Sequence, residues 1–198
     1  MHEKNRFLGA GMLPADLPPF PNGYQRGKYL WLYDQPDGYY RRHLLLHEGT
    51  HAFMSQFLGA MGPPWYAEGM AELLGTHRWQ DGVLTLGYVP QDKSETPGWG
   101  RVKIIKDEVA AGRGMMPAAI LDYGPQAHQR NEPYAWCWGL ATFLDAHPRC
   151  QERFRHLRGL VRDPDFTARF QQQLQADWPA INEDWQLFVM NLEYGYDV

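Results

Sequence analysis

The segment HLLLHEGTH, from His43 to His51, has two histidines four residues apart with a glutamate directly after the first of them. If this segment is helical, His47 and His51 project from the same face one turn apart, so both imidazoles can reach one point. Imidazole is a common zinc ligand, and Glu48 lies a step round the helix, where its carboxylate can reach a water on such a metal. The spacing therefore predicts a metal site in which Glu48 is a base and not a ligand.

The sequence leaves other interpretations of these histidines open. The HExxH pattern is short enough to occur by chance, in which case His47 and His51 are ordinary surface or core residues. His43 lies one further turn back on the same face and could pair with His47 instead. We favour His47 and His51 because only this pair brackets a glutamate and points toward the next predicted helix.

A third ligand is expected, because a catalytic zinc ion uses three protein ligands and keeps one position for water. The segment PPWYAEGMAELLG supplies Glu68, and the preceding GAMGPP allows the chain to reverse so that two helices lie side by side. Glu72 follows one turn later, where it can accept the free N–H of a ligand histidine. The alternative is that both glutamates lie on a solvated helix face, but two carboxylates at usable spacing favour the metal site.

HEGTH and WYAEGMAE together resemble the zinc-binding motifs of the gluzincin metallopeptidases, whose ligands are two histidines and a glutamate. The similarity is greatest to small bacterial peptidase-MA-like domains, in which the second motif has the form W-x-x-E-G-x-A-E. The resemblance implies one zinc ion (Zn²⁺) per chain, bound by His47, His51 and Glu68. It also implies a zincin-like fold with a strand beside the active-site helix, the metal between two helices, and a helical lobe that closes the cleft.

The same family places a tyrosine at the start of a later helix, and NEPYAWCWGLATFL is similar to that segment. The resemblance thus gives Tyr134 the role of donating a hydrogen bond to the oxyanion. His128, in YGPQAHQRN, is an alternative residue for this role. No G-x-M-E-N segment precedes the first helix, although aminopeptidases of this clan use one to hold the substrate's amino terminus, which puts aminopeptidase activity in question.

These roles together predict hydrolysis of a peptide bond. A zinc ion held by the three ligands lowers the pKa of its bound water toward about 7, and Glu48 takes the proton as the water attacks and returns it to the leaving amine. The predicted activity is that of a zinc metallopeptidase acting on peptide or protein substrates. The alternatives are a catalytically inactive peptidase-like domain that binds a metal or another protein, and a helical interaction domain with no metal.

The elements that must position these residues predict an α+β fold that is mostly α-helical. GKYLWLY, residues 27–33, alternates as a strand does, and Asp37 can cap a helix that runs to about Leu58. A hairpin around QDG is expected after the second helix, followed by a polar loop over residues 90–100. The first helix is predicted to bury a stripe formed by Leu46, Thr50, Phe53 and Phe57.

The C-terminal part is predicted to be a set of helices with an aromatic core. Asn131 and Pro133 begin one helix, and Pro148 and Pro164 precede others. We expect residues 1–98 to form the zinc-binding lobe and residues 99–198 the helical lobe that closes the cleft, within one compact catalytic unit. The residues expected inside the helical lobe are Tyr134, Trp138, Phe143, Phe154, Leu157, Phe166, Phe170, Ile181, Trp185, Phe188 and Leu192.

Composition excludes several other classes of protein. The 198 residues carry a net charge of −4 with lysines and arginines scattered along the chain, so we expect no nucleic-acid partner. Cys137 and Cys150 lack the CxxC spacing of a cysteine zinc site or redox pair. The longest apolar run is too short for a transmembrane helix, and the N-terminal segment has no apolar core of the signal-peptide type. We therefore expect no membrane span, and a cytoplasmic location unless the chain is an excised domain.

Overall fold

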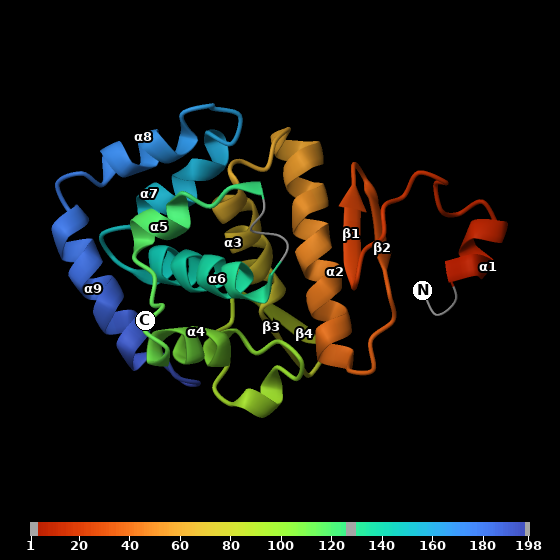
Figure 1. Cartoon of the computed structure of the whole chain (residues 1–198), viewed down its shortest axis with the longest axis horizontal. Coiled ribbons are helices and arrows are strands. Elements are labelled where there is room, and N and C mark those ends of the chain that lie inside the picture. The colour runs from red at the N-terminus through yellow and green to blue at the C-terminus, as the bar shows by residue number, and fades with distance from the viewer. Residues whose placement is uncertain (1–3, 126–129, 197–198) are drawn as a thin grey trace.

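Residues 4–125 and 130–196 are described by the computed structural model of the chain (Figure 1). Within them the fold is α+β and mostly helical, with two separate two-stranded antiparallel sheets, which confirms the predicted fold class at this level. The sheets pair β1 (Gly23–Arg26) with β2 (Tyr29–Leu32), and β3 (His77–Gln80) with β4 (Val83–Leu86). The helices are α1 (Lys4–Gly9), α2 (Gly38–Phe53), α3 (Pro64–Gly75), α4 (Arg101–Ala110), α5 (Pro117–Leu121), α6 (Asn131–Ala146), α7 (Gln151–His156), α8 (Phe166–Gln173) and α9 (Trp178–Asn191).

A β-hairpin lies beside α2, where the sequence predicted one strand over residues 27–33. β1 and β2 pair with Tyr24 opposite Trp31, and the two-residue turn between them begins at Gly27, whose φ of 61° suits glycine. The extra strand, GYQR, is too short to show an alternating pattern. Because β1 lies between β2 and α2 in Figure 1, β1 is the strand that approaches the histidines of α2.

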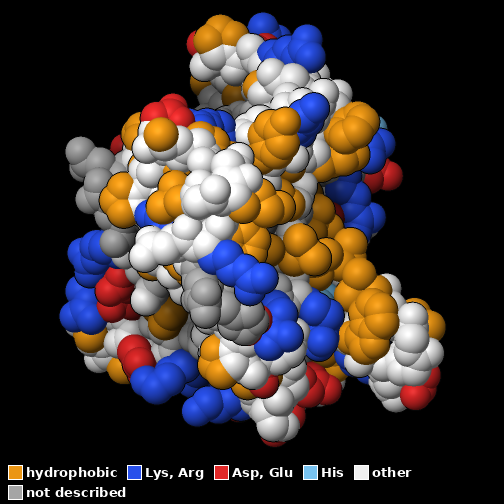
Figure 2. All heavy atoms as spheres, turned by 90° about the vertical axis from the view of Figure 1, so that its right-hand side faces the viewer, with side chains coloured by type: hydrophobic (Ala, Val, Ile, Leu, Met, Phe, Trp, Pro, Cys, Tyr) orange, Lys and Arg blue, Asp and Glu red, His pale blue; other side chains and the backbone are white. Residues whose placement is uncertain are grey.

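The face formed by α1, the first hairpin and the outer side of α2 carries exposed hydrophobic side chains. Figure 2 views the molecule from this side and shows them gathered together, with basic side chains around them. A shallow groove on this face is lined by Phe7, Met12, Tyr29, Trp31 and Leu45, among others. The sequence pattern did not predict this patch, because its residues come from three short segments without a common period.

The start of α2 is capped as the sequence predicts. The carboxylate of Asp37 accepts hydrogen bonds from the backbone N–H groups of Tyr39 (2.6 Å) and Tyr40 (3.3 Å). At its other end α2 continues into a π-helical turn over Met54–Leu58, which ends at Gly59 with a φ of 80°. The helical segment therefore covers the predicted length, although its last turn is wider than an α-helix.

The predicted buried stripe of α2 is wrong in two of its four positions. Phe53 is 53% exposed and Phe57 is 75% exposed, whereas Thr50 is buried and Leu46 half-buried. The helix turns its polar side inward because α3 presents carboxylates that hydrogen-bond with that side, which leaves the two phenylalanines on the flank. The buried residues of α2 are Tyr39, His43, Leu44, His47, Glu48, Thr50 and His51.

The central helix α3 packs against α2 on one side and α6 on the other. Pro64 occupies the first turn, where its missing N–H has no cost, and the helix ends at Gly75. On the α6 side, a Cβ on Gly69 would lie 3.2 Å from the carbonyl oxygen of Cys137 and 3.1 Å from the Cβ of Ala141. Glycine at this position therefore allows the two helix backbones to approach closely.

The helical lobe has the aromatic core that the sequence predicts. Trp99 and Trp138 meet edge to face with ring centroids 4.7 Å apart, and Trp185 contacts Phe143 in the same way at 5.5 Å. The buried hydrophobic cluster runs without a break from Tyr39 and Trp65 through α6 to Leu192. The expected lobes, residues 1–98 and 99–198, thus share one core. Cys137 and Cys150 are both buried and free.

The second hairpin is also found where it was predicted. β3 and β4 are joined by Asp81 and Gly82, both with positive φ (52° and 78°), as the type of turn that joins adjacent strands requires. The residues of β4 are exposed, and the hairpin carries Trp79 on its surface. Within the described part of the chain, no helix is long and apolar enough to cross a membrane.

Candidate metal centre

Two imidazoles converge at the middle of α2. His47 and His51 are one turn apart, both are buried, and their Nε2 atoms lie 3.1 Å from each other. Two histidines in this arrangement leave their ring nitrogens facing one point between α2 and α3. The structure thus brings together the pair that the sequence favoured.

Glu68 of α3 completes a group of three donors. Its two carboxylate oxygens lie 3.3 Å from His47 Nε2 and 3.4 Å from His51 Nε2. Donors bound to zinc at roughly 2.05 Å lie about 3.3 Å from one another in a tetrahedron. The two imidazole nitrogens are about this far apart, and each has one carboxylate oxygen of Glu68 at about this distance, so the residues present fit a zinc ion held by two imidazoles and one carboxylate.

The charge of the site also suits a cation. Burial alone lowers the pKa of His47, but hydrogen bonds with Glu68 and Glu72 outweigh burial and raise that pKa to about 10. The negative charges of Glu68 and Glu72 stabilise the positive charge of protonated His47. The same charges also favour a divalent cation bound at this position. Because a ligand histidine must be unprotonated, metal binding here would release a proton.

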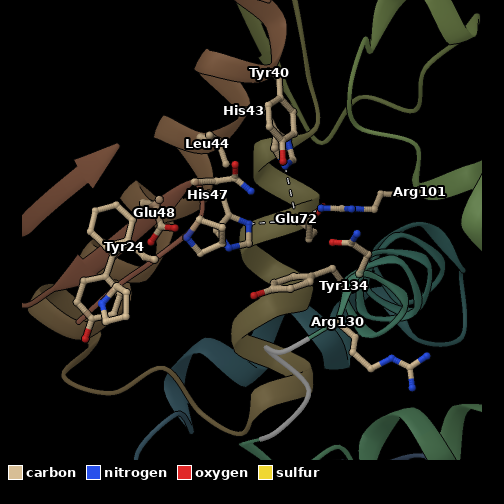
Figure 3. Close-up of a pocket in the computed structure, with 16 residues that line it drawn as sticks. Tyr24, Tyr40, His43, Leu44, His47, Glu48, Glu72, Arg101, Arg130 and Tyr134 are labelled. Atoms are coloured by element: carbon tan, nitrogen blue, oxygen red, sulfur yellow. Dashed lines mark hydrogen bonds and ion pairs between the residues drawn. The ribbon is translucent and has the colours of Figure 1, made fainter. Parts of the chain in front are cut away.

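Glu72 lies one turn after Glu68 and contacts the other side of the His47 ring. Its Oε1 is 3.2 Å from His47 Nδ1, so it can accept the N–H of that nitrogen while Nε2 faces the metal position. Burial raises the pKa of Glu72, but the Arg101 guanidinium and His43 outweigh burial and hold it well below its usual range. Figure 3 shows Glu72 between the rings of His43 and His47 and the side chain of Arg101.

His43 was the alternative partner of His47, and the structure places it away from His51. Its Nε2 lies 3.6 Å from Glu72 Oε1, and its ring packs against Gly75 at the end of α3. Among the described residues, two groups of three donors could hold an ion: His47, His51 and Glu68, and His43, His47 and Glu72. Both groups use His47.

Glu48 follows His47 on α2 and is likewise buried. Burial raises the pKa of its carboxyl group, and the neighbouring His47 and His51 partly offset this. Its carboxylate packs against Gly23 of β1, where an added Cβ would lie 2.7 Å from Glu48 Oε1. Gly23 therefore lets the strand approach the glutamate, and any larger residue would displace the carboxylate.

Two cavities meet at Glu48. One has a volume of about 340 Å³ and the other about 410 Å³, and both are lined by His47, Glu48 and Tyr134. The smaller cavity extends toward Tyr40, and the larger one toward Met61. An extended ligand can thus lie across Glu48 with a part in each cavity.

Tyr134 stands in the first turn of α6 and reaches the site across α3. Its ring centroid lies 5.9 Å from that of His47, and the guanidinium of Arg101 is 5.7 Å from the tyrosine ring. Burial, followed by the nearby carboxylates, raises the pKa of Tyr134, so its hydroxyl remains a donor at neutral pH. The alternative residue, His128, lies outside the described residues.

Two residues of the site were not predicted from the sequence. Gly23 and Arg101 stand in segments without any motif, although Tyr24, which follows Gly23, also lines both cavities. Only the fold brings them to Glu48 and Glu72.

No protein-family model matches this chain, and no curated protein or solved structure matches it significantly. The resemblance of the two motifs to those of gluzincins therefore stays a prediction, and the nature of the site is inferred from its geometry.

Proposed function

We propose that this protein is a zinc-dependent peptidase of the gluzincin type, with His47, His51 and Glu68 as the metal ligands. The observation that supports this most strongly is that the Nε2 atoms of His47 and His51 lie 3.1 Å apart, with one carboxylate oxygen of Glu68 3.3 or 3.4 Å from each, beside a buried Glu48 that lines two cavities. A zinc ion held there supplies Lewis acidity, which lowers the pKa of a water molecule toward about 7 and polarises a peptide carbonyl.

Glu48 is the general base of the proposed reaction. It accepts the proton of the attacking water and then gives it to the leaving amine, so that the carboxylate is restored at the end of the cycle. Its raised pKa moves it toward the range in which a carboxyl group both accepts and returns a proton at neutral pH. Because Gly23 has no side chain, β1 can lie against this carboxylate without displacing it.

Two further residues support the reaction. Glu72 accepts the Nδ1 proton of His47 and so directs Nε2 toward the metal. Tyr134, whose raised pKa keeps its hydroxyl protonated, donates a hydrogen bond to the oxyanion that forms when the carbonyl is attacked. A zincin-like arrangement agrees with these roles, since β1 lies beside α2, the three ligands come from α2 and α3, and the helical lobe contributes Tyr134.

The proposed function is tested with Glu48→Gln. The amide keeps the shape of the side chain and removes the base, so the variant should retain about one zinc per chain, as the parent does, and lose nearly all hydrolysis of a peptide library. Zinc content is measured by mass spectrometry after dialysis, and cleavage by chromatography of the products.

Glu152→Gln is the matched control, because Glu152 is exposed on α7, and it should cleave like the parent. Equal turnover by Glu48→Gln and the parent would exclude this mechanism. A parent that binds zinc but cleaves no peptide would instead favour an inactive metal-binding domain.

A further inference from the structure

The two groups of donors in the site compete for the same histidine. His47 offers Nε2 to the group with His51 and Glu68, and Nδ1 to the group with His43 and Glu72. Both groups are buried and both hold two imidazoles and one carboxylate. Residue types alone therefore do not decide which group takes a metal ion.

Arg101 distinguishes the two groups. Its Nε donates to Glu72 Oε2 at 2.8 Å and one terminal nitrogen donates to Oε1 at 3.0 Å, which is a bidentate pair. The oxygen that faces both His43 and His47 is Oε1, so the arginine binds the atom that would have to bind a metal. Arg101 is itself buried and comes from α4, the first helix of the helical lobe.

A metal ion at the second group would meet two obstacles. First, it would share Glu72 Oε1 with the N–H group that Arg101 donates to that oxygen. Second, it would lie beside the positive charge of the Arg101 guanidinium, where water screens the repulsion little. The guanidinium cannot relieve this repulsion by losing its proton, because arginine stays charged in proteins. Glu72 is therefore neutralised by Arg101 and is held as a hydrogen-bond acceptor for His47.

We propose that Arg101 is a positioning residue that closes the group of His43, His47 and Glu72 to metal ions and so assigns zinc to His47, His51 and Glu68. This inference rests on the metal ligands of the proposed function and does not depend on catalysis. Without Arg101, the carboxylate of Glu72 would be buried next to two histidines with no fixed counter-charge, a situation that a divalent ion relieves.

The test is whether loss of Arg101 restores a metal site that has been destroyed elsewhere. Glu68→Ala should lose its zinc at a concentration that saturates the parent. Glu68→Ala combined with Arg101→Met should recover close to one zinc per chain, because the second group is then open. Addition of His43→Ala to this double variant should remove the zinc again, whereas His43→Ala alone should leave the zinc content of the parent unchanged. Zinc is measured by equilibrium dialysis, and the ligand set by the absorption spectrum of the Co²⁺ form.

Several results would overturn the proposal. One is a double variant as free of zinc as Glu68→Ala, and another is recovered zinc that does not depend on His43. Loss of zinc from the single variant His43→Ala would also overturn it. Arg101 is still present in this variant, so this loss would mean that His43 binds zinc although Arg101 is in place. If Arg101→Met does not fold, Arg101→Leu also removes both the charge and the hydrogen-bond donor and must give the same recovery.

Failure of this inference can be told apart from failure of the proposed function. A parent that binds one zinc through Glu68 but hydrolyses no peptide would reject the peptidase and leave the role of Arg101 standing. A peptidase whose Glu68→Ala variant is not rescued by loss of Arg101 would reject only the role of Arg101.

Discussion

The helices α2 and α9 both pack against the interior of the molecule, but they bury opposite kinds of side chain. The buried side chains of α9 are apolar: Ile181, Trp185, Phe188 and Val189. Most of those of α2 are polar or charged, and the aromatic residues near its end face solvent. The inner face of α9 is thus an ordinary core surface, whereas that of α2 carries the candidate metal ligands.

The two helices are therefore expected to contribute to different properties, α9 to the stability of the fold and α2 to the chemistry of the site. Burial of the α9 side chains removes apolar surface from water, which favours folding directly. Burial of the α2 histidines and glutamate removes their hydration, and only hydrogen bonds, ion pairs or a bound cation offset that cost. We therefore expect substitutions in α9 to change the free energy of unfolding, and substitutions around α2 to change activity.

The largest expected effect on stability is that of Trp185→Ala. Trp185 is buried, packs against Trp136, Phe143 and Phe188, and donates a hydrogen bond from Nε1 to the carbonyl oxygen of Met115 at 2.8 Å. Its removal should lower the free energy of unfolding by about 3–5 kcal/mol, because a large cavity is left. Urea denaturation measured by circular dichroism gives this value.

Leu187→Ala is the control in the same helix, because Leu187 is 59% exposed. It should change the free energy of unfolding by no more than about 0.5 kcal/mol. If both variants lose the same amount, α9 does not owe its stability to its inner face and the contrast with α2 fails.

A smaller effect, seen mainly in the rate of catalysis, is expected for Tyr134→Phe. As the oxyanion donor, the hydroxyl should contribute roughly 10²- to 10³-fold to kcat, while zinc content stays unchanged. The free energy of unfolding should fall by no more than about 1 kcal/mol, the usual contribution of one hydrogen bond. Steady-state kinetics and urea denaturation of the same preparation provide both numbers.

His128→Ala is measured alongside, since it is the alternative donor. If kcat of Tyr134→Phe equals that of the parent while His128→Ala is strongly impaired, the oxyanion role belongs to His128. If Tyr134→Phe loses stability instead of activity, the tyrosine is an ordinary core residue of α6.

The smallest effect is expected for Phe57→Ala at the outer side of the π-helical turn. Phe57 is 75% exposed and stacks only on Phe53 among the ring contacts of the described residues, so its loss should change the free energy of unfolding by no more than about 0.5 kcal/mol. Met54→Ala, in the same turn but buried, should cost about 2–5 kcal/mol. A large loss for Phe57 would mean that the predicted stripe, and not the polar face, packs inward.

The features predicted well from the sequence are those encoded by neighbouring residues. The aspartate cap of α2, the Asp81–Gly82 turn and the aromatic helices each depend on a short local pattern, and so does the spacing that brings His47, His51 and Glu68 together. Gly23 and Arg101 could not be predicted, because each acts on a residue far along the chain. The orientation of α2 was mispredicted at Phe53 because hydrophobicity is a poor guide where a helix buries a site.

The close contact between Gly69 and the backbone of Cys137 has a mechanical consequence. Two helices packed at this distance cannot slide past each other without a clash, so a displacement of α6 must carry α3 with it. Glu68 is one residue before this contact, and Tyr134 is one turn before Cys137 on α6. The carboxylate of Glu68 and the phenol of Tyr134 are therefore expected to move together as one rigid unit. Any opening of the site would have to separate this unit from the histidines of α2.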